Sequence, residues 1–443
     1  MDYVLLKNGL VVGEQSIVTS DVLIGNNKII AVEEELSRPE PETPIIDAGG
    51  KYIFSGAVDT NVAFTVIGEQ EVDKQRKLNQ AEIISGTTAL LETLEPSYST
   101  FSQDELSHRK NEKINLIPDF GYHLSFHGWK DFDVREIDYC YSHEGITSFV
   151  IKWPFQQEFE RDRFNQMLDM IKRFDLLLIV EMQRPIAPGS GYMGMNHMFE
   201  EAIVQHLHQL RNILNIVANA DCKALFLNIC FAEELELIQQ FSNHQRIFAE
   251  LMLPCHLGDS SRFEVDEHTV FSGFPLIGKL NLISTHDFWE ILKKEQFIIS
   301  RPSFNFAGEG VLKDSQVHNR PDEFFLLKNF LSMVYTSGVI TGKLSFADFV
   351  DIVSTRPARL MGLYPQKGVI RPGADADLVI WDPDFERNLY CNFPQMISTF
   401  EESLKLRGRA EFVFIKGQMA YNGENFFIEN IRGKFLYRSP CQD

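Results

Sequence analysis

The sequence predicts an α/β fold in which an eight-stranded parallel barrel interrupts a small β unit made from both ends of the chain. Three observations lead to this prediction. Apolar strand patterns alternate with amphipathic helical patterns about eight times in the middle of the chain, which favours parallel strands with crossover helices. Both ends carry β patterns instead. A length of 443 residues leaves room for a barrel of roughly 250–300 residues and a smaller unit.

The first 54 residues read as short strands. Residues 4–12 contain an Asn8-Gly9 turn signal, and residues 21–32 place Gly25-Asn26-Asn27 between two apolar runs, which is typical of a hairpin. A Pro-rich connector at residues 37–44 precedes further strand patterns at residues 45–47 and 52–54. We expect this segment to form the N-terminal part of the small β unit.

The middle of the chain, residues 55–364, carries the barrel pattern. Its predicted strands are residues 58–64, 87–94, 114–121, 147–153, 176–182, 224–231, 246–253 and 296–300. Apolar residues recur at three- and four-residue spacing in residues 156–174 and 199–217, which predicts amphipathic helices between strands. Residues 365–443 return to β character at 368–373, 377–381 and 411–421, and we expect them to complete the small unit.

Composition excludes several classes of function. The net charge is −20, and phosphate backbones attract clustered Lys and Arg, so we expect no nucleic-acid partner. The sequence has no run of about 18 apolar residues, so we expect no membrane span, and the first residues lack the pattern of a secretory signal. The six cysteines are scattered, which is typical of buried free thiols in a reducing compartment. We therefore expect a cytoplasmic protein with no membrane partner.

Several motifs resemble one family over nearly the whole chain. Residues 46–53 with Gly56-Ala57-Val58-Asp59 resemble the start of the barrel in the amidohydrolase superfamily, and residues 367–382 (KGVIRPGADADLVIWD) resemble its end. Residues 119–123, 145–149 and 354–359 match further landmarks of the cyclic amidohydrolases, which include dihydropyrimidinase, hydantoinase, allantoinase and dihydroorotase. The resemblance implies a TIM-type (β/α)8 barrel, a small β-sandwich built from both termini, and a dimer or tetramer.

The resemblance also implies a metal centre at the mouth of the barrel. In the family, two divalent cations, commonly zinc, activate a water that attacks a cyclic amide carbonyl. The implied ligands are a His-x-His pair after the first strand, a carboxylated Lys on the fourth strand, His on the fifth and sixth strands, and an Asp after the eighth strand.

This sequence departs from that ligand pattern at each position. The first pair aligns on Asn61 and Ala63, and the carboxylated Lys aligns on Val150. Lys152 lies two residues further, on the same face of a strand, and is the one candidate for a displaced ligand, although a Lys at a strand end is the simpler interpretation.

The remaining family ligands also align on other residue types. The histidines of the fifth and sixth strands align on Glu181 and Asn228, and the acid aligns on Arg301. An Asn amide is a poor zinc ligand, Ala and Val cannot bind a metal, and an Arg repels one. We therefore predict no catalytic residue, no metal and no cofactor, and a vestigial pocket at Asn61, Ala63, Val150, Glu181, Asn228 and Arg301.

Other groupings offer weaker sites. His206 and His208 point about 200° apart on a predicted helix and cannot share an ion, so we expect solvated histidines there. His123, four residues before His127, is expected to make structural hydrogen bonds. Cys255-His256 could combine a nucleophile with a base, but neighbours in an extended segment point apart. The glycine-rich residues 189–194 lack the strand and helix that a phosphate loop needs.

Three functional hypotheses follow. The preferred one is an inactive member that acts by association, with itself or with an active relative, as a scaffold or subunit. The second is a protein that binds a ureide or cyclic amide in the vestigial pocket. The third is a hydrolase of cyclic amide C–N bonds with rearranged ligands or metal-free chemistry.

Overall fold

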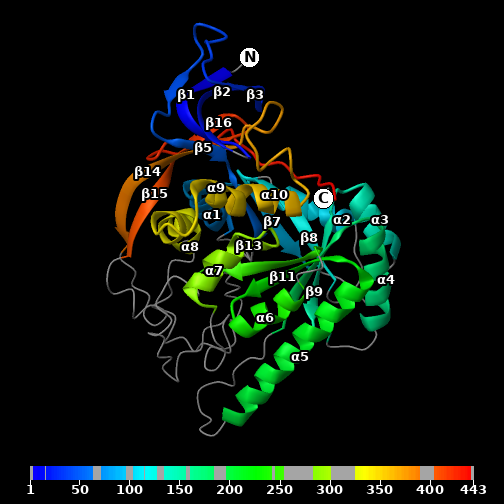
Figure 1. Cartoon of the computed structure of the whole chain (residues 1–443). Coiled ribbons are helices and arrows are strands. Elements are labelled where there is room, and N and C mark those ends of the chain that lie inside the picture. The colour runs from blue at the N-terminus through cyan, green and yellow to red at the C-terminus, as the bar shows by residue number, and fades with distance from the viewer. Residues whose placement is uncertain are drawn as a thin grey trace.

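The computed structural model describes residues 3–14, 16–62, 71–95, 103–113, 115–126, 134–155, 160–183, 196–241, 245–253, 283–300, 325–389 and 404–440. It contains two sheets of eight strands each (Figure 1). The smaller unit, built from both ends of the chain, sits over one end of the larger sheet and its helices. Within the described residues, no helix is long and apolar enough to cross a membrane.

The larger sheet is the predicted α/β barrel. Its strands are parallel and follow the chain in order. They are β6 (Ala57–Val62), β7 (Thr87–Leu94), β8 (Asp119–Ser125), β9 (Ser148–Trp153), β10 (Leu177–Met182), β11 (Lys223–Ile229), β12 (Ile247–Met252) and β13 (Phe297–Ser300). The first and last strands, β6 and β13, contact each other, so the sheet curls round toward closure.

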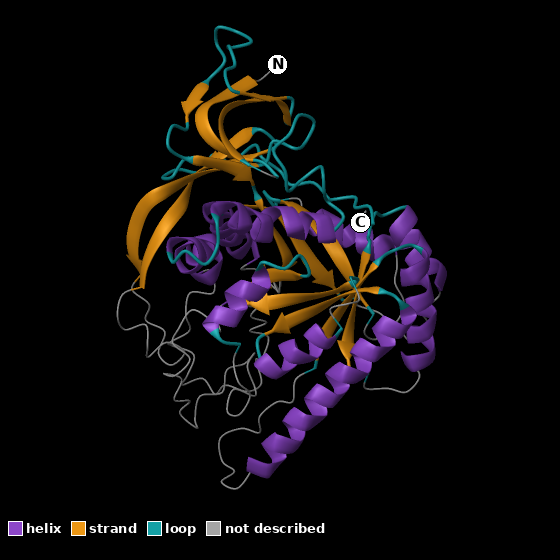
Figure 2. Ribbon diagram, in the orientation of Figure 1, coloured by secondary structure: helices purple, strands orange, loops and turns teal. Residues whose placement is uncertain are grey.

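Helices flank the outside of this sheet (Figure 2). They are α1 (Glu71–Ser85), α2 (Gln103–Glu112), α3 (Val134–Ser142), α4 (Glu160–Arg173), α5 (Asn196–Ala220), α6 (Ala232–Gln240), α7 (Thr285–Leu292), α8 (Phe325–Val334), the π-helical η4 (Tyr335–Ile340), α9 (Phe346–Val350), the π-helical η5 (Asp351–Thr355) and α10 (Arg356–Leu360). The apolar spacing in α4 explains its packing, because Phe164, Met167, Leu168 and Ile171 lie on one face and are all buried.

One predicted strand is displaced. The apolar run from residue 114 predicts a strand over 114–121, whereas β8 covers Asp119–Ser125. Pro118 has no N–H to donate to a sheet, and the preceding residues bond elsewhere: the side chain of Asn79 contacts the carbonyl of Asn115 (2.9 Å) and the N–H of Ile117 (3.0 Å). Leu116 and Ile117 are buried without being part of the sheet.

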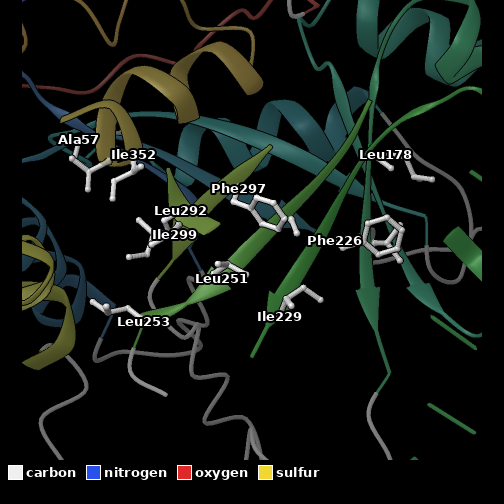
Figure 3. Packing of buried hydrophobic residues seen from close by; sticks show 14 of the residues in the cluster. Ala57, Leu178, Phe226, Ile229, Leu251, Leu253, Leu292, Phe297, Ile299 and Ile352 are labelled. Atoms are coloured by element: carbon white, nitrogen blue, oxygen red, sulfur yellow. The ribbon is translucent and has the colours of Figure 1, made fainter. Parts of the chain in front are cut away.

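Alternation along the strands separates an outer from an inner apolar layer. Outward side chains such as Leu251, Phe297 and Ile299 pack against the surrounding elements (Figure 3). Inward side chains form a second cluster that includes Val58, Leu91, Val150, Ile179, Leu225 and Ile298. The period of two in each strand accounts for this division, and the barrel is a filled core rather than a pore.

The smaller sheet joins the two ends of the chain, as the β patterns predict. Its strands are β1 (Tyr3–Val12), β2 (Ile17–Gly25), β3 (Lys28–Glu33), β4 (Ile45–Asp47), β5 (Tyr52–Ser55), β14 (Leu378–Leu389), β15 (Leu404–Ile415) and β16 (Gln418–Tyr421). Strand β14 pairs antiparallel with β5, so this pairing connects the C-terminal to the N-terminal part. A separate cluster, with Leu6, Ile24, Ile53, Ile380 and Phe414 among its members, fills this unit.

After β16, the tail crosses the N-terminal end of the barrel strands. Backbone hydrogen bonds join Leu436 to Phe120 (2.7 Å), Arg438 to Gly145 (2.9 Å) and Ser439 to Gly362 (3.2 Å). A Cβ on Gly145 would lie 2.7 Å from the Cα of Tyr437, and one on Gly362 would lie 1.7 Å from the carbonyl oxygen of Ser439. Glycine at these two positions therefore leaves room for the tail, and Leu436 joins the inner layer of the barrel.

Candidate functional site

Six positions align with family ligands, and the structure describes four of them, Asn61, Val150, Glu181 and Asn228, on four different strands. Asn61 lies near the end of β6, where its N–H donates to Asp59 Oδ1 (3.0 Å). Val150 is buried in β9 and belongs to the inner apolar layer. Ala63 and Arg301 lie outside the described residues. The aligned position on the fourth strand therefore carries an inward aliphatic side chain, which offers no metal ligand.

Lys152 lies at the end of β9 between two carboxylates. Its Nζ contacts Glu95, and it pairs in register with Glu181 on β10. Burial alone would lower the pKa of Lys152, but its hydrogen bond to Glu95 and the charges of Glu181 and Glu95 outweigh burial and raise it. Carboxylation needs a neutral amine, so these contacts oppose the modification that a bridging Lys ligand requires.

Asn228 interrupts β11. Its φ is 59°, in the left-handed region that Asn tolerates better than most residues, and the pairing of β11 with β12 shifts register between Phe226 and Ile229. This geometry directs the N–H of Asn228 to the carboxyl group of Glu250. The structure thus uses the backbone of Asn228 to hold a neighbouring side chain.

Glu250 is a functional candidate that the sequence analysis missed. It is fully buried in β12, and its Oε2 accepts a hydrogen bond from the Thr60 hydroxyl (3.2 Å). Burial raises the pKa of Glu250 to about 7, and the charge of Asp59 acts in the same direction. The hydrogen bonds from Ser300, Thr60 and Asn228 only partly oppose them. One signal in the sequence could have revealed Glu250. It is an acid within the predicted strand 246–253, and the period of two places it on the opposite face from the outward Leu251, together with Phe248 and Met252.

His123 completes a polar layer with Thr60 across the inside of the barrel. Its Nε2 donates to the carbonyl of Thr60 (2.9 Å), because a carbonyl can only accept, and its Nδ1 therefore accepts from the hydroxyl of Ser148 (2.5 Å). Burial, together with the charge of Arg438, lowers the pKa of His123 to about 3. The hydrogen-bonding role expected for His123 is confirmed, and its ring is neutral and occupied on both nitrogens.

A separate acidic cluster lies at the opposite, N-terminal end of the strands. Among the described residues, Asp119, Asp375 and Asp377 have carboxylate oxygens within 4.8 Å of one another. The ammonium of Lys367 already lies among them, 2.8 Å from Asp119 and 3.2 Å from Asp375, and it also contacts Asp377. This buried ammonium occupies the position a cation would take, and the N-terminal face of such a barrel serves stability rather than chemistry.

His206 corrects one expectation from the sequence. It is buried on α5, and its Nε2 lies 2.8 Å from Oε1 of Glu234 on α6, whereas His208 on the same helix is exposed. Glu234 also accepts the N–H groups of Cys230 and Phe231 (both 3.2 Å), so the pair joins α5 to the start of α6. His206 is not solvated because α5 packs against α6 at this turn. The two histidines do point apart, as the helical spacing predicts. His127, Cys255, His256 and residues 189–194 lie outside the described residues.

The comparisons with known proteins point to amidohydrolases, over part of the chain for the family model and over nearly the whole chain for the relatives. A family model for the amidohydrolase family matches residues 314–420. The chain is 26% identical to a D-hydantoinase from Geobacillus stearothermophilus, covering 98% of this chain and 96% of that protein. It is 23% identical to a dihydropyrimidinase from Dictyostelium discoideum, covering 99% and 91%.

Solved structures give the same result for the fold. The crystal structure of a dihydropyrimidinase from Brevibacillus agri superposes with a TM-score of 0.76 at 20% identity over the whole of both chains. A crystal structure of a D-hydantoinase, whose organism its description does not name, superposes with a TM-score of 0.78 at 22% identity, again over both whole chains. These likenesses confirm the predicted barrel with a small β-sandwich.

Proposed function

We propose that this member of the cyclic amidohydrolase branch of the amidohydrolase superfamily has kept the barrel of its relatives without their metal centre, and acts by association as a scaffold or subunit. The observation that carries the proposal is Val150, an aliphatic side chain in the inner apolar layer at the position of the bridging Lys. The chemistry of the surrounding groups agrees with it. Asn61 is a poor zinc ligand, and Lys152 is held as a cation by Glu95 and Glu181. These residues do not fit a pair of zinc ions.

The partner in this proposal is a second copy of the chain, in a dimer or tetramer, or an active relative. The buried free thiols of Cys140, Cys222 and Cys230 support a reducing, cytoplasmic location. The division into residues 1–54, 55–364 and 365–443 is part of the same proposal.

Three measurements on one preparation test it. Protein purified without chelators is assayed for bound metal, for opening of dihydropyrimidine and hydantoin rings, and for mass under native conditions, alone and with an active relative. We expect no stoichiometric zinc, no turnover and a mass above that of one chain. Stoichiometric zinc with ring opening overturns the proposal in favour of a hydrolase, and a strict monomer that captures no relative overturns the associative role.

A ureide- or cyclic-amide-binding role is the second candidate, and Glu250 favours it. This carboxyl group is fully buried and its pKa is raised to about 7, so near neutral pH it offers a ligand amide either a donor or an acceptor. A thermal-shift series with hydantoin and dihydrouracil tests this role, because a ligand that binds only the native state must raise its stability. The Glu250→Gln variant is the matched control, and binding that depends on Glu250 supports the second candidate.

A further inference from the structure

Arg438, on the tail, is buried at the N-terminal end of the barrel strands, which we call the floor of the barrel, and it has no counter-charge among the described residues. The residue is 4% exposed, and its Nη2 donates to the carbonyl of Tyr122. Its Nε and Nη1 are buried and have no hydrogen-bond partner within the described residues. No carboxylate among those residues forms an ion pair with it, so its charge is balanced by one carbonyl alone.

The surroundings of Arg438 are apolar or already occupied. Leu436, from the same tail, packs with Leu91 and the rest of the inner layer. Gly121 faces the guanidinium, since a Cβ there would lie 3.7 Å from Arg438 Nε. His123 feels the charge of Arg438 but uses both ring nitrogens elsewhere. Among the described residues, no acceptor forms a hydrogen bond with the N–H groups of Arg438 Nε and Nη1.

Lys367, at the same end of the barrel, shows how this protein satisfies another buried cation. Lys367 is also fully buried, but it contacts three carboxylates, and their charges outweigh burial and raise its pKa. Burial instead lowers the pKa of Arg438 to about 9, with no opposing charge. An isolated buried cation is strongly unfavourable unless an anion or several acceptors satisfy it.

We propose that Arg438 anchors a binding site for a small oxyanion, a phosphate or a simple carboxylate, inside the floor of the barrel. A guanidinium presents several N–H donors in one plane and binds such oxygens with charge-assisted hydrogen bonds. We restrict the occupant to a small anion because Arg438 is only 4% exposed and Leu436 of the same tail belongs to the inner layer of the barrel. The proposal is independent of whether the opposite, C-terminal end of the barrel holds a metal.

The test measures thermal unfolding of the full chain at constant ionic strength while chloride is replaced by inorganic phosphate or by acetate. Phosphate also stabilises proteins generally by exclusion from their surface, so the comparison between variants decides the result. Arg438→Met removes the charge and keeps most of the volume. Arg432→Met is the matched control, because Arg432 lies on the same tail, is exposed and contacts only carbonyls.

We expect a saturable rise in the melting temperature of the wild type and of Arg432→Met, with at least one of the two anions, and no saturable rise in Arg438→Met. The anion that acts distinguishes a phosphate from a carboxylate site. Equal shifts of the melting temperature in the wild type and Arg438→Met overturn the proposal, and so does the lack of a saturable shift with either anion. Internal water would then be the partner of Arg438.

A second variant keeps the test decisive if Arg438→Met does not fold. Arg438→Lys retains the charge but loses the planar set of donors, and calorimetric titration should then give a dissociation constant at least tenfold weaker than that of the wild type. An unchanged dissociation constant contradicts the site.

Discussion

The Nζ of Lys367 lies 2.8 Å from the Oδ2 of Asp119, although the two residues are 248 positions apart. Asp119 begins a barrel strand, and Lys367 follows the last helix of the barrel region. Asp119 also contacts Lys416 (2.7 Å) and accepts the N–H of Lys434 (2.7 Å). One carboxylate therefore joins the barrel, the small sheet and the tail.

Replacing Lys367 by Met should destabilise the protein strongly. The variant leaves three carboxylates close together without their shared ammonium, and breaking a buried ion pair from one side costs about 3–5 kcal/mol. Urea unfolding at pH 7 measures the loss. Lys28→Met is the control, because Lys28 pairs with Asp375 from a position that is 41% exposed, and such pairs contribute about 1 kcal/mol or less. Similar losses in the two variants would contradict the central role of Lys367.

Glu250 should make the protein less stable as the pH rises from about 4.5 to 7. Its pKa is raised to about 7 from an ordinary value of 4.5, so in this window the folded state binds more protons than the unfolded state and stability falls with increasing pH. Glu250→Gln should remove this dependence and be the more stable form at pH 8, by roughly 2–4 kcal/mol for a shift of this size. Unfolding of both proteins between pH 4.5 and 8 measures the difference. Glu429→Gln, at an exposed position of the tail, should leave the wild-type profile unchanged.

Lys152 should remain uncarboxylated. Because Glu95 and Glu181 stabilise its ammonium form, little neutral amine is available to react with carbon dioxide. Carbon-13 spectra of the protein in labelled bicarbonate should show no carbamate resonance. An active hydantoinase that carries the modified Lys is the positive control and should show one. A carbamate signal that disappears in Lys152→Ala would identify Lys152 as the displaced ligand after all.

Gly362 should be essential for seating the tail. Gly362→Ala places a methyl group against the carbonyl of Ser439, and the φ of +71° adds backbone strain. We expect faster trimming by carboxypeptidase and a loss of stability of about 1–3 kcal/mol or more. Gly373→Ala is the matched control, since Gly373 has a φ of +91° but nothing within 4 Å of its added Cβ. If backbone strain were the only cause, the two variants would lose the same stability. A larger loss and faster trimming in Gly362→Ala than in Gly373→Ala would show that the tail is displaced.

The fold could be predicted from the sequence because its signals are local. Apolar runs and helical spacing located seven of the eight barrel strands closely, and the exception, β8, starts late because Pro118 and Asn79 take the preceding backbone out of the sheet. The positions of Asn61, Val150 and Lys152 on their strands also followed from local pattern and alignment.

The interior chemistry could not be predicted in the same way. Thr60, His123 and Glu250 lie on three different strands, and nothing in the spacing of these residues along the chain records that they meet. The burial of His206 depends on Glu234 in another helix. The sequence contains no signal that Arg438 is buried, because only the folded barrel shows that the tail places this residue inside.

The position of the tail sets an order for the biogenesis of this protein. The first barrel strand begins at Ala57, yet Leu436, which joins the inner layer of the barrel, is synthesised after all eight barrel strands. A nascent chain on the ribosome can therefore pair its barrel strands before Leu436 is available to complete their inner layer.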